Sequence, residues 1–465
     1  MMGKNKKLEP KLFYHGVSLE RRIPQDHPLR KIDQLVDFSF IRSKVSDLYG
    51  GVGNPSVDPV VILKLMFLTF FENVKSERRL MKQLAFRLDW LWFCGYDIDE
   101  EIPDHSVISK ARRRWGADVF TEFFEIILFQ CIEAGLVDGE IIHVDASMID
   151  ANASRDTLKC QFRQVSDDLY RDLEDSAEPP KLAKRASPTD PDARLGRKYG
   201  NTTLGYKDHR AVDDKCGIVT ATVTTPANVN DENTLTKVIE EHQSNTDSKV
   251  KTAVADNVYG TGENFKYMYQ NGIKPFMKPR SGNSRCHPDF SHTKFKYDRK
   301  NDCYICPAGK TLKIKHNNRT ENAVTYIAER KVCEQCQHMD KCLTSKISGR
   351  QVQRNINKDY IDWGVNCLPK HERKRLMARR KYKAEGSFAD AANNHGFKRM
   401  RFRGIEKARM QNLMIAAIQN LRKLMRYVSL KPAVSGCNKA LSTIICDNLA
   451  RLSRFWEFGR IVSQH

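Results

Sequence analysis

Two apolar, strand-like runs that each end in an aspartate constrain this chain most. One spans residues 140–145 and ends at Asp145, and the other spans residues 250–256 and ends at Asp256. Strand ends hold side chains rigidly, and rigidly held carboxylates are the oxygen ligands that Mg²⁺ or Mn²⁺ prefers. A third acid, Glu385, lies in a helical stretch, 379–388, that is otherwise rich in positive charge. Together the three carboxylates predict a divalent-metal site that acts on phosphate.

The charge balance supports a polyanionic partner. The chain has 78 Lys and Arg against 57 Asp and Glu, a formal net charge of +21. Such an excess is typical of nucleic-acid binding, and a basic protein without such a partner is the alternative. No apolar core of a signal peptide follows the basic N-terminus, and no apolar run approaches the ~18 residues of a membrane span. We therefore expect a cytoplasmic protein with no membrane partner, whose 13 cysteines are not a disulfide framework.

Hydrophobic periodicity divides the chain into a helical first part and a strand-rich middle. Helices are expected over 59–71, after the N-cap residue Ser76, and over 105–115. From residue 139 onward the pattern predicts a strand at 140–145, a hairpin of 206–212 and 218–223, a helix over 231–243 and a strand ending at Asp256. His209, in the hairpin, is expected to be buried and hydrogen-bonded. Further helices are expected near 160–175, within 369–428 and in the tail, 430–465.

Five cysteines in the segment 281–350 have the spacing of a metal site. They form two CxxC pairs with a fifth cysteine nearby: Cys303, Cys306, Cys333, Cys336 and Cys342. Thiolates at such spacing suit a closed, tetrahedral, structural Zn²⁺ site, and free buried thiols are the alternative. Because five cysteines exceed four coordination positions, the residues alone leave the ligand set open.

Several ordered blocks resemble bacterial insertion-sequence transposases of the DDE type. Residues 142–153 (IHVDASMIDANA) are similar to the first catalytic block of that family, and residues 254–260 (VADNVYG) are similar to the second. Residues 385–390 (EGSFAD), followed by 395–397 (HGF) and 401–404 (RFRG), resemble the third. Shorter segments at 188–193, 205–209 and 225–231 also match. The resemblance runs in order from about residue 10 to about residue 428, which makes it far more specific than any single block.

The resemblance implies an α/β fold with an RNase H-like mixed sheet flanked by helices, an N-terminal all-helical DNA-binding region and a small zinc-ribbon-like insert. The implied division is 1–135 for DNA binding, 136–280 for the first part of the catalytic core, 281–350 for the insert, 351–430 for the core helices with the glutamate, and 431–465 for the tail. Asp145, Asp256 and Glu385 would form the metal-binding triad, with two Mg²⁺ or Mn²⁺ ions. Asp150 and Asp231 are further acids that could lie next to this triad. In the alternative interpretation, Glu385 forms a surface salt bridge with Lys381 or Arg380.

The resemblance also assigns the zinc ligands and the DNA contacts. It favours Cys306, Cys333, Cys336 and Cys342 as the zinc ligands, with Cys303 as the spare. Residues 105–114 would be the recognition helix of a helix-turn-helix, and a solvated helix face is the alternative. The expected contacts are Ser106, Ser109, Lys110, Arg112, Arg113, Lys398, Arg401 and Arg403.

One position departs from the family pattern. Related transposases commonly carry a basic residue seven positions after the glutamate, and Ala392 stands there. Lys398, Arg399, Arg401 and Arg403 lie downstream as candidate substitutes.

The sequence therefore predicts a transposase that cuts transposon ends and joins them to target DNA by metal-dependent phosphoryl transfer. Its partner would be double-stranded DNA, both terminal inverted repeats and target, bound by at least a homodimer in a bacterial cytoplasm at the nucleoid. Two alternatives stay open: an inactive transposase descendant that still binds DNA, and a DNA-binding regulator. Terminal-repeat sequence, target preference and a hairpin intermediate cannot be read from the chain.

Overall fold

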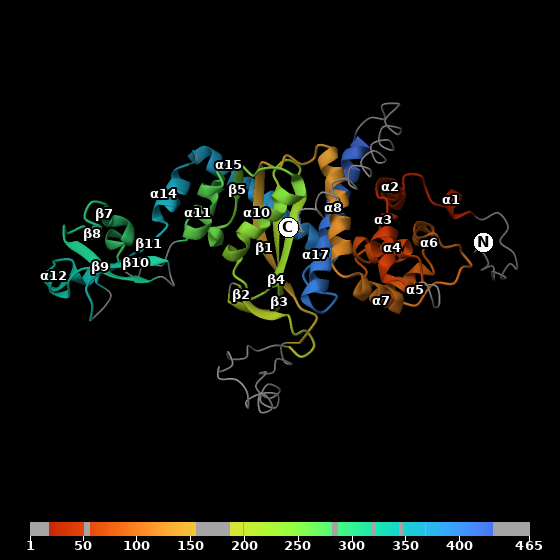
Figure 1. The fold of residues 1–465 in the computed structure, drawn as a ribbon, viewed down its shortest axis with the longest axis horizontal. Coiled ribbons are helices and arrows are strands. Elements are labelled where there is room, and N and C mark those ends of the chain that lie inside the picture. The colour runs from red at the N-terminus through yellow and green to blue at the C-terminus, as the bar shows by residue number, and fades with distance from the viewer. Residues whose placement is uncertain are drawn as a thin grey trace, which may run out of the picture.

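The computed structural model describes residues 18–50, 56–154, 187–198, 200–280, 287–318, 322–343, 347–367 and 369–430. Within these residues the molecule is elongated, with a helical region at one end, a mixed sheet in the middle and a smaller sheet at the other end (Figure 1). The helices expected near 160–175 and in the tail beyond residue 430 lie outside the described residues.

Helices make up the N-terminal region. They are α1 (Leu19–Arg22), α2 (Pro28–Leu35), α3 (Phe40–Val45), η1 (Ser46–Leu48), α4 (Pro59–Phe71), α5 (Glu77–Leu84), α6 (Leu88–Cys94), α7 (Ser106–Trp115) and α8 (Asp118–Glu133). The Asp58 side chain accepts the Val60 N–H at the start of α4, and the Ser76 hydroxyl accepts the Arg79 N–H at the start of α5. Such contacts satisfy amides that have no partner within the helix. The three helices expected from sequence here are confirmed as α4, α5 and α7.

The central sheet is mixed. Its elements are β1 (Ile141–Asp150), β2 (Arg194–Lys198), β3 (Asn201–Asp213), β4 (Val219–Pro226), η3 (Asp231–Thr234), α10 (Leu235–Thr246), β5 (Thr252–Val254), η4 (Asn257–Tyr259), α11 (Gly262–Gln270) and β6 (Lys274–Phe276). The strands lie in the order β2-β3-β1-β5-β6, and β4 also pairs with β3. β3 is antiparallel to β1, β2 and β4, whereas β5 is parallel to β1 and to β6.

The structure confirms the hairpin and corrects one strand. β3 and β4 form the hairpin expected around residues 213–217. The strand expected to end at Asp145 instead continues to Asp150, because residues 145–150 pair with residues 205–210 of β3. This pairing is a long-range contact, which the local apolar pattern of 140–145 does not reveal. The helix expected from residue 231 begins as the 3₁₀ turn η3 and continues as α10.

The cysteine-rich segment forms a second, five-stranded sheet with the order β11-β10-β9-β8-β7. Its elements are η5 (Pro288–Phe290), η6 (His292–Lys294), β7 (Lys296–Asp298), β8 (Cys303–Ile305), β9 (Thr311–Asn318), β10 (Ala323–Ile327), α12 (Arg330–Glu334), α13 (Met339–Cys342) and β11 (Gln351–Asn355). A small core of its own, which includes Phe295, Tyr304 and Tyr326, holds it together.

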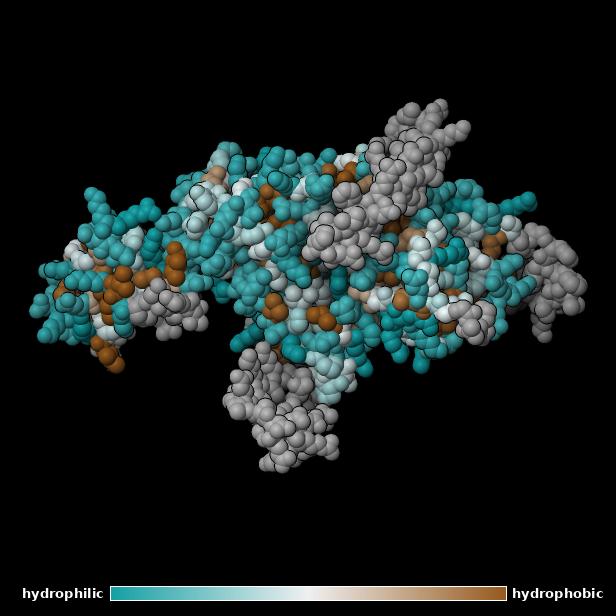
Figure 2. All heavy atoms as spheres, viewed as in Figure 1, coloured by the Kyte–Doolittle hydropathy of each residue, from teal (hydrophilic) through white to brown (hydrophobic). Residues whose placement is uncertain are grey.

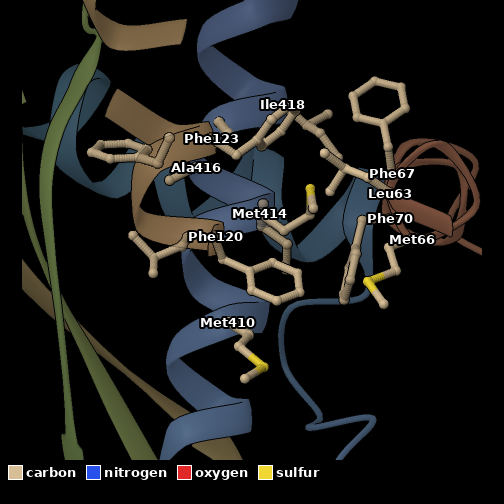
Figure 3. Close-up of a cluster of buried hydrophobic side chains, with 14 of the residues drawn as sticks. Leu63, Met66, Phe67, Phe70, Phe120, Phe123, Met410, Met414, Ala416 and Ile418 are labelled. Carbon is tan, nitrogen blue, oxygen red and sulfur yellow. The ribbon is translucent and has the colours of Figure 1, made fainter. Parts of the chain in front are cut away.

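The C-terminal helices connect the sheet to the N-terminal region. They are α14 (Lys358–Asn366), α15 (Lys370–Arg380), the π-helical turn η8 (Lys381–Glu385), α16 (Gly386–His395) and α17 (Ile405–Leu430). α17 lies beside α8 (Figure 1), and Figure 3 shows its side chains Met410, Met414 and Ile418 packed among aromatic residues of α4 and α8. The Asn420 side chain also bonds the backbone of Val219 in β4. One hydrophobic core therefore joins the helical region to the sheet, while the outer face in Figure 2 is mainly hydrophilic.

Candidate active site

Two of the three predicted acids belong to neighbouring parallel strands, one within its strand and one just after it. Asp145 lies within β1, and Asp256 lies two residues after the end of β5. His143 pairs with Val254 in the parallel register, so Asp145 and Asp256 both lie two residues beyond that pair. Parallel strands run in the same direction, and the two acids therefore lie at the same edge of the sheet.

Arg380 contacts both Glu385 and Asp145. The Nη1 atom of Arg380 lies 3.5 Å from Oδ2 of Asp145, and its Nη2 atom donates a hydrogen bond of 3.0 Å to Oε1 of Glu385. The Arg380 side chain is 11% exposed, compared with 46% for Glu385. The structure thus contains the Arg380 salt bridge of the alternative interpretation of Glu385, and the same guanidinium brings this residue to Asp145.

A buried tyrosine lies beneath these charges. Tyr259 is 1% exposed, and its hydroxyl has no hydrogen-bond partner among the described residues. Burial raises the pKa of this hydroxyl well above its ordinary value, and the negative charges of Asp231, Asp145 and Asp256 act in the same direction. The positive charge of Arg380 opposes them. Tyr259 therefore lies close to Asp145 and Asp256, where its hydroxyl can donate to an oxygen ligand.

The donor set suits a hard divalent cation. Three carboxylates supply only oxygen ligands, and a buried hydroxyl without a partner adds a polar group beside them. Within the part of the chain that the structure describes, no three His, Cys, Asp or Glu side chains are close enough together to hold a metal ion as they are placed. The position between Asp145 and Glu385 is occupied by the guanidinium of Arg380.

The face of β1 that carries Asp145 receives basic groups from the C-terminal helices. Successive side chains of a strand alternate between faces, so His143, Asp145 and Ser147 share one face. His143 Nε2 lies 2.7 Å from Oδ1 of Asp214, whose other oxygen lies 2.9 Å from Nη2 of Arg379. Burial lowers the pKa of His143, although Asp214 acts to raise it.

Ser147, the third residue on this face, is hydrogen-bonded to Lys398 of the third family block. The ammonium of Lys398 donates a hydrogen bond of 2.8 Å to the Ser147 hydroxyl. Lys398 itself is exposed, so its charge is accessible at the edge of the same face as Asp145. Lys398, one of the basic residues considered as substitutes for Ala392, thus contacts a residue of the strand face that carries Asp145.

A buried ion pair lies opposite Asp145. Arg210 of β3 is the cross-strand partner of Asp145, and its Nε atom donates to Oδ2 of Asp208 at 2.7 Å. Both side chains are fully buried. The Nη1 atom of Arg210 also donates to the Ser387 hydroxyl at 2.9 Å and to the Gln419 side chain at 2.8 Å. Arg210 therefore ties the strand beside Asp145 to the helix that begins directly after Glu385.

Sequence reasoning did not single out Arg210 or Tyr259. No local pattern marks Arg210 as buried, since its partners Ser387 and Gln419 are more than 170 residues away along the chain. Tyr259 lies in the second family block, three residues after Asp256, which is the signal that could have identified it.

The expected DNA contacts on α7 divide into exposed and buried residues. Lys110 and Arg113 are exposed, and Ser106 and Ser109 are half-buried. Arg112 is 7% exposed, pairs with Glu77 of α5 and lies 3.6 Å from the centre of the Phe402 ring. Because its guanidinium joins three parts of the core, we do not include Arg112 in the DNA-contact surface.

Of the two downstream arginines, Arg401 is largely buried and Arg403 is exposed. Arg401 donates to the Thr69 carbonyl at 2.6 Å and to the His395 carbonyl at 2.9 Å, and burial lowers its pKa to about 10. Arg401 is therefore a link between α4 and α16, and we omit it from the DNA surface. Arg403 is exposed and donates to the Asn152 carbonyl at 3.0 Å. The side chain of His209, as expected, is buried and hydrogen-bonded to two threonine hydroxyls, Thr225 and Thr234.

The four favoured cysteines line one small cavity in the second sheet region. Cys306, Cys333, Cys336 and Cys342 all border a space of about 30 Å³, and Cys303 does not. The Lys310 N–H donates to the Cys306 sulfur at 3.2 Å, and Gly309, with a φ of 74°, closes the turn between them. This backbone geometry makes the Cys306 sulfur a hydrogen-bond acceptor.

No helix among the described residues is long and apolar enough to cross a membrane. Comparison with known proteins gives two family matches. Residues 17–114 match the model described as Transposase domain (DUF772), and residues 305–425 match the model described as Transposase DDE domain. No curated protein matches the chain.

Two solved structures to which the chain is similar are also transposases. One is a piggyBac transposase synaptic complex with hairpin DNA, at 11% identity and a TM-score of 0.30, covering 89% of this chain and 82% of that chain. The other is a Mos1 transposase paired-end complex with left transposon end, at 11% identity and a TM-score of 0.15, covering 51% of this chain and 64% of that chain. Two separate parts of this chain thus match models of transposase domains, and the second of these is a transposase DDE domain.

Proposed function

We propose that this transposase cuts the ends of its DNA element and joins them to target DNA by metal-dependent phosphoryl transfer at Asp145, Asp256 and Glu385. The observation that supports the proposal is that Asp145 and Asp256 lie at one sheet edge, and that Arg380 lies within 3.5 Å of Asp145 and bonds Glu385 at 3.0 Å. The strand order, three antiparallel strands followed by two parallel ones, supports an RNase H-like core.

Each group has a defined role in this proposal. Asp145, Asp256 and Glu385 hold two Mg²⁺ or Mn²⁺ ions. When bound, such ions neutralise charge on the phosphate and lower the pKa of the attacking water or 3′-hydroxyl. The Tyr259 hydroxyl orients a carboxylate from below, and the Lys398 ammonium neutralises the phosphate in place of the basic residue missing at Ala392. Phosphate diester attack needs little covalent help, so positioning and charge carry the chemistry.

The test is a strand-nicking assay on the DNA ends that flank this gene. Wild type is compared with Glu385→Gln and with Glu372→Gln, a matched control in the first turn of α15. We expect cleavage at the end boundaries with Mg²⁺ or Mn²⁺ in wild type and control, and none in Glu385→Gln. Equal cleavage in all three proteins would refute the assigned site. Specific binding without cleavage in any of them would support the inactive descendant that Ala392 suggests, with Ala392→Lys as the next variant.

For DNA binding, we propose a surface on α7 and the third block. It consists of Ser106, Ser109, Lys110, Arg113, Lys398 and Arg403, and Arg112 and Arg401 are not part of it. The partner is double-stranded DNA, terminal repeats and target, and cutting two ends requires at least a dimer of the chain. The five-part division of the chain given above, with a bacterial nucleoid location, belongs to the same proposal.

For the insert, we propose a structural Zn²⁺ site made by Cys306, Cys333, Cys336 and Cys342. Its support is the shared cavity and the N–H···S bond to Cys306. Metal analysis of the purified protein is expected to find about one zinc per chain, lost in Cys333→Ser/Cys336→Ser. Cys303→Ser is the matched control and retains the zinc. Unchanged zinc content in the double variant would rule the site out.

A further inference from the structure

We propose that Arg380 is a catalytic residue that changes partners during the reaction. Before the reaction it neutralises Asp145 and Glu385, and when a divalent cation takes these carboxylates it transfers to a phosphate of the DNA. This inference rests on the proposed metal site and adds a residue that the acids alone do not define.

The contacts of Arg380 are suited to exchange. Its Nη2 atom makes a hydrogen bond of 3.0 Å to Glu385, whereas its Nη1 atom lies 3.5 Å from Asp145 and makes no hydrogen bond. A guanidinium has five N–H donors, so at least one donor here is buried and unused. A buried donor without a partner is costly, and that cost favours any new acceptor that reaches it.

The residues on either side of Arg380 are anchored to a hairpin turn, whereas the Arg380 side chain itself does not contact that turn. The preceding residue, Arg379, binds both the side chain and the carbonyl of Asp214 at 2.9 and 3.1 Å. Three residues after Arg380, in η8, Lys383 donates to the Lys215 carbonyl at 3.0 Å. Both anchors lie on the turn of the β3–β4 hairpin. Arg380 therefore stands between two anchored residues, directly before a π-helical turn, and such turns are frequent at functional sites.

Arg380 and a divalent cation cannot both bind the carboxylates of Asp145 and Glu385, because their positive charges repel. A divalent cation bound by Asp145 and Glu385 repels a guanidinium that stays within about 4 Å of the same oxygens. The Arg380 side chain is only 11% exposed, so once released it requires another anion nearby. A phosphate of the DNA backbone is that anion, because the guanidinium fork binds phosphate oxygens in a bidentate manner.

The first measurement is Mn²⁺ affinity without DNA, followed by electron paramagnetic resonance. Removing a competing cation tightens metal binding, so Arg380→Gln is expected to bind Mn²⁺ about tenfold more tightly than wild type. Lys381→Gln loses the same charge one residue away, from an exposed side chain, and is the matched control that stays close to wild type. Arg380→Lys keeps the charge and is expected to retain the weak affinity of wild type.

The second measurement is DNA affinity by fluorescence anisotropy, in EDTA and in Ca²⁺ at equal ionic strength. Linkage requires that metal binding, by freeing Arg380, strengthens DNA binding, and this gain is expected to be about threefold smaller in Arg380→Gln than in Lys381→Gln. Circular dichroism and melting temperature confirm that each variant is folded.

The outcomes separate this inference from the proposed function. If Asp145→Asn and Glu385→Gln bind Mn²⁺ as wild type does, the metal site itself is wrong. If those variants lose Mn²⁺ while Arg380→Gln binds it no more tightly than wild type, the site stands and the exchange of Arg380 is refuted. Tight Mn²⁺ binding by Arg380→Lys would also overturn it, because the retained charge should still compete.

Discussion

Replacing Arg210 with methionine tests whether the buried ion pair positions the helix that follows Glu385. The change removes the Asp208 pair and the hydrogen bonds to Ser387 and Gln419 at 2.9 and 2.8 Å. It also removes the guanidinium that lies 4.7 Å from the Phe388 ring centre. Breaking a buried pair by deleting one partner costs about 3–5 kcal/mol, because the remaining charge stays uncompensated.

The structure makes the upper part of that range the better expectation. After the change, the fully buried Asp208 retains the Thr222 hydroxyl as a donor but has no ion-pair partner among the described residues. We therefore expect a loss of about 4–5 kcal/mol in local unfolding free energy. The double variant Asp208→Leu/Arg210→Met removes both charges and is expected to recover more than half of the loss.

Hydrogen exchange measured by mass spectrometry on peptides of β3 and α16 is the assay, because it reports local rather than global opening. Protection of α16 should fall in Arg210→Met and return largely in the double variant. Mn²⁺ affinity should fall in both variants, since neither connects β3 to Ser387 and Glu385 loses its fixed position. A loss below about 1 kcal/mol, or a double variant no better than the single one, would refute this account of the buried pair.

Two further predictions concern pH and salt. Burial lowers the pKa of His209 and of His395 to about 4. Because the unfolded chain binds protons at a pKa near 6.5, the stability contributed by each neutral histidine is fully present above that pH. It is lost progressively as the pH falls from about 6.5 to about 4, and the loss is roughly 2 kcal/mol at pH 5. Denaturant titration should show that His209→Gln weakens this dependence, and an unchanged pH profile would contradict it. In the DNA-binding titration, Lys110→Ala and Arg113→Ala should each reduce the slope of log K against log salt by about 0.9. Arg112→Ala should leave that slope unchanged and lower the melting temperature instead, because it leaves Glu77 of α5 without its partner.

Patterns that depend on neighbouring residues were predictable from the sequence. The Ser76 cap, the helix after Pro59 and the hairpin around 213–217 all follow from local chemistry, and the structure confirms them. The length of β1 was not predictable in this way, since its second half exists only through pairing with β3.

The buried position of Arg112 had a local signal in the sequence. Ile108, Ala111 and Trp115 are buried in α7, and the spacing of a helix places residue 112 on the same face. Charge alone suggested a DNA contact, whereas periodicity indicates a buried link. Helical position is therefore the better guide for arginines in this region.

The surroundings of the acids could not be predicted from sequence spacing. His143, Asp145 and Ser147 lie two residues apart on β1. The basic residues that contact this face directly (Arg380 and Lys398) or through Asp214 (Arg379) span 20 residues of helix and turn. Three positive charges thus line one strand face because helix geometry and the turn after His395 return the chain to that face.

The same geometry explains how a basic residue at position 392 can be absent. What a phosphate beside the acids requires is a positive charge at a place in space, not at a fixed number of residues after Glu385. In the proposed function, the ammonium of Lys398, held at 2.8 Å from Ser147 on the face that carries Asp145, would supply that charge from six residues further along the chain than Ala392. On this argument the departure at position 392 moves the source of the charge and leaves the electrostatic requirement of the site fulfilled.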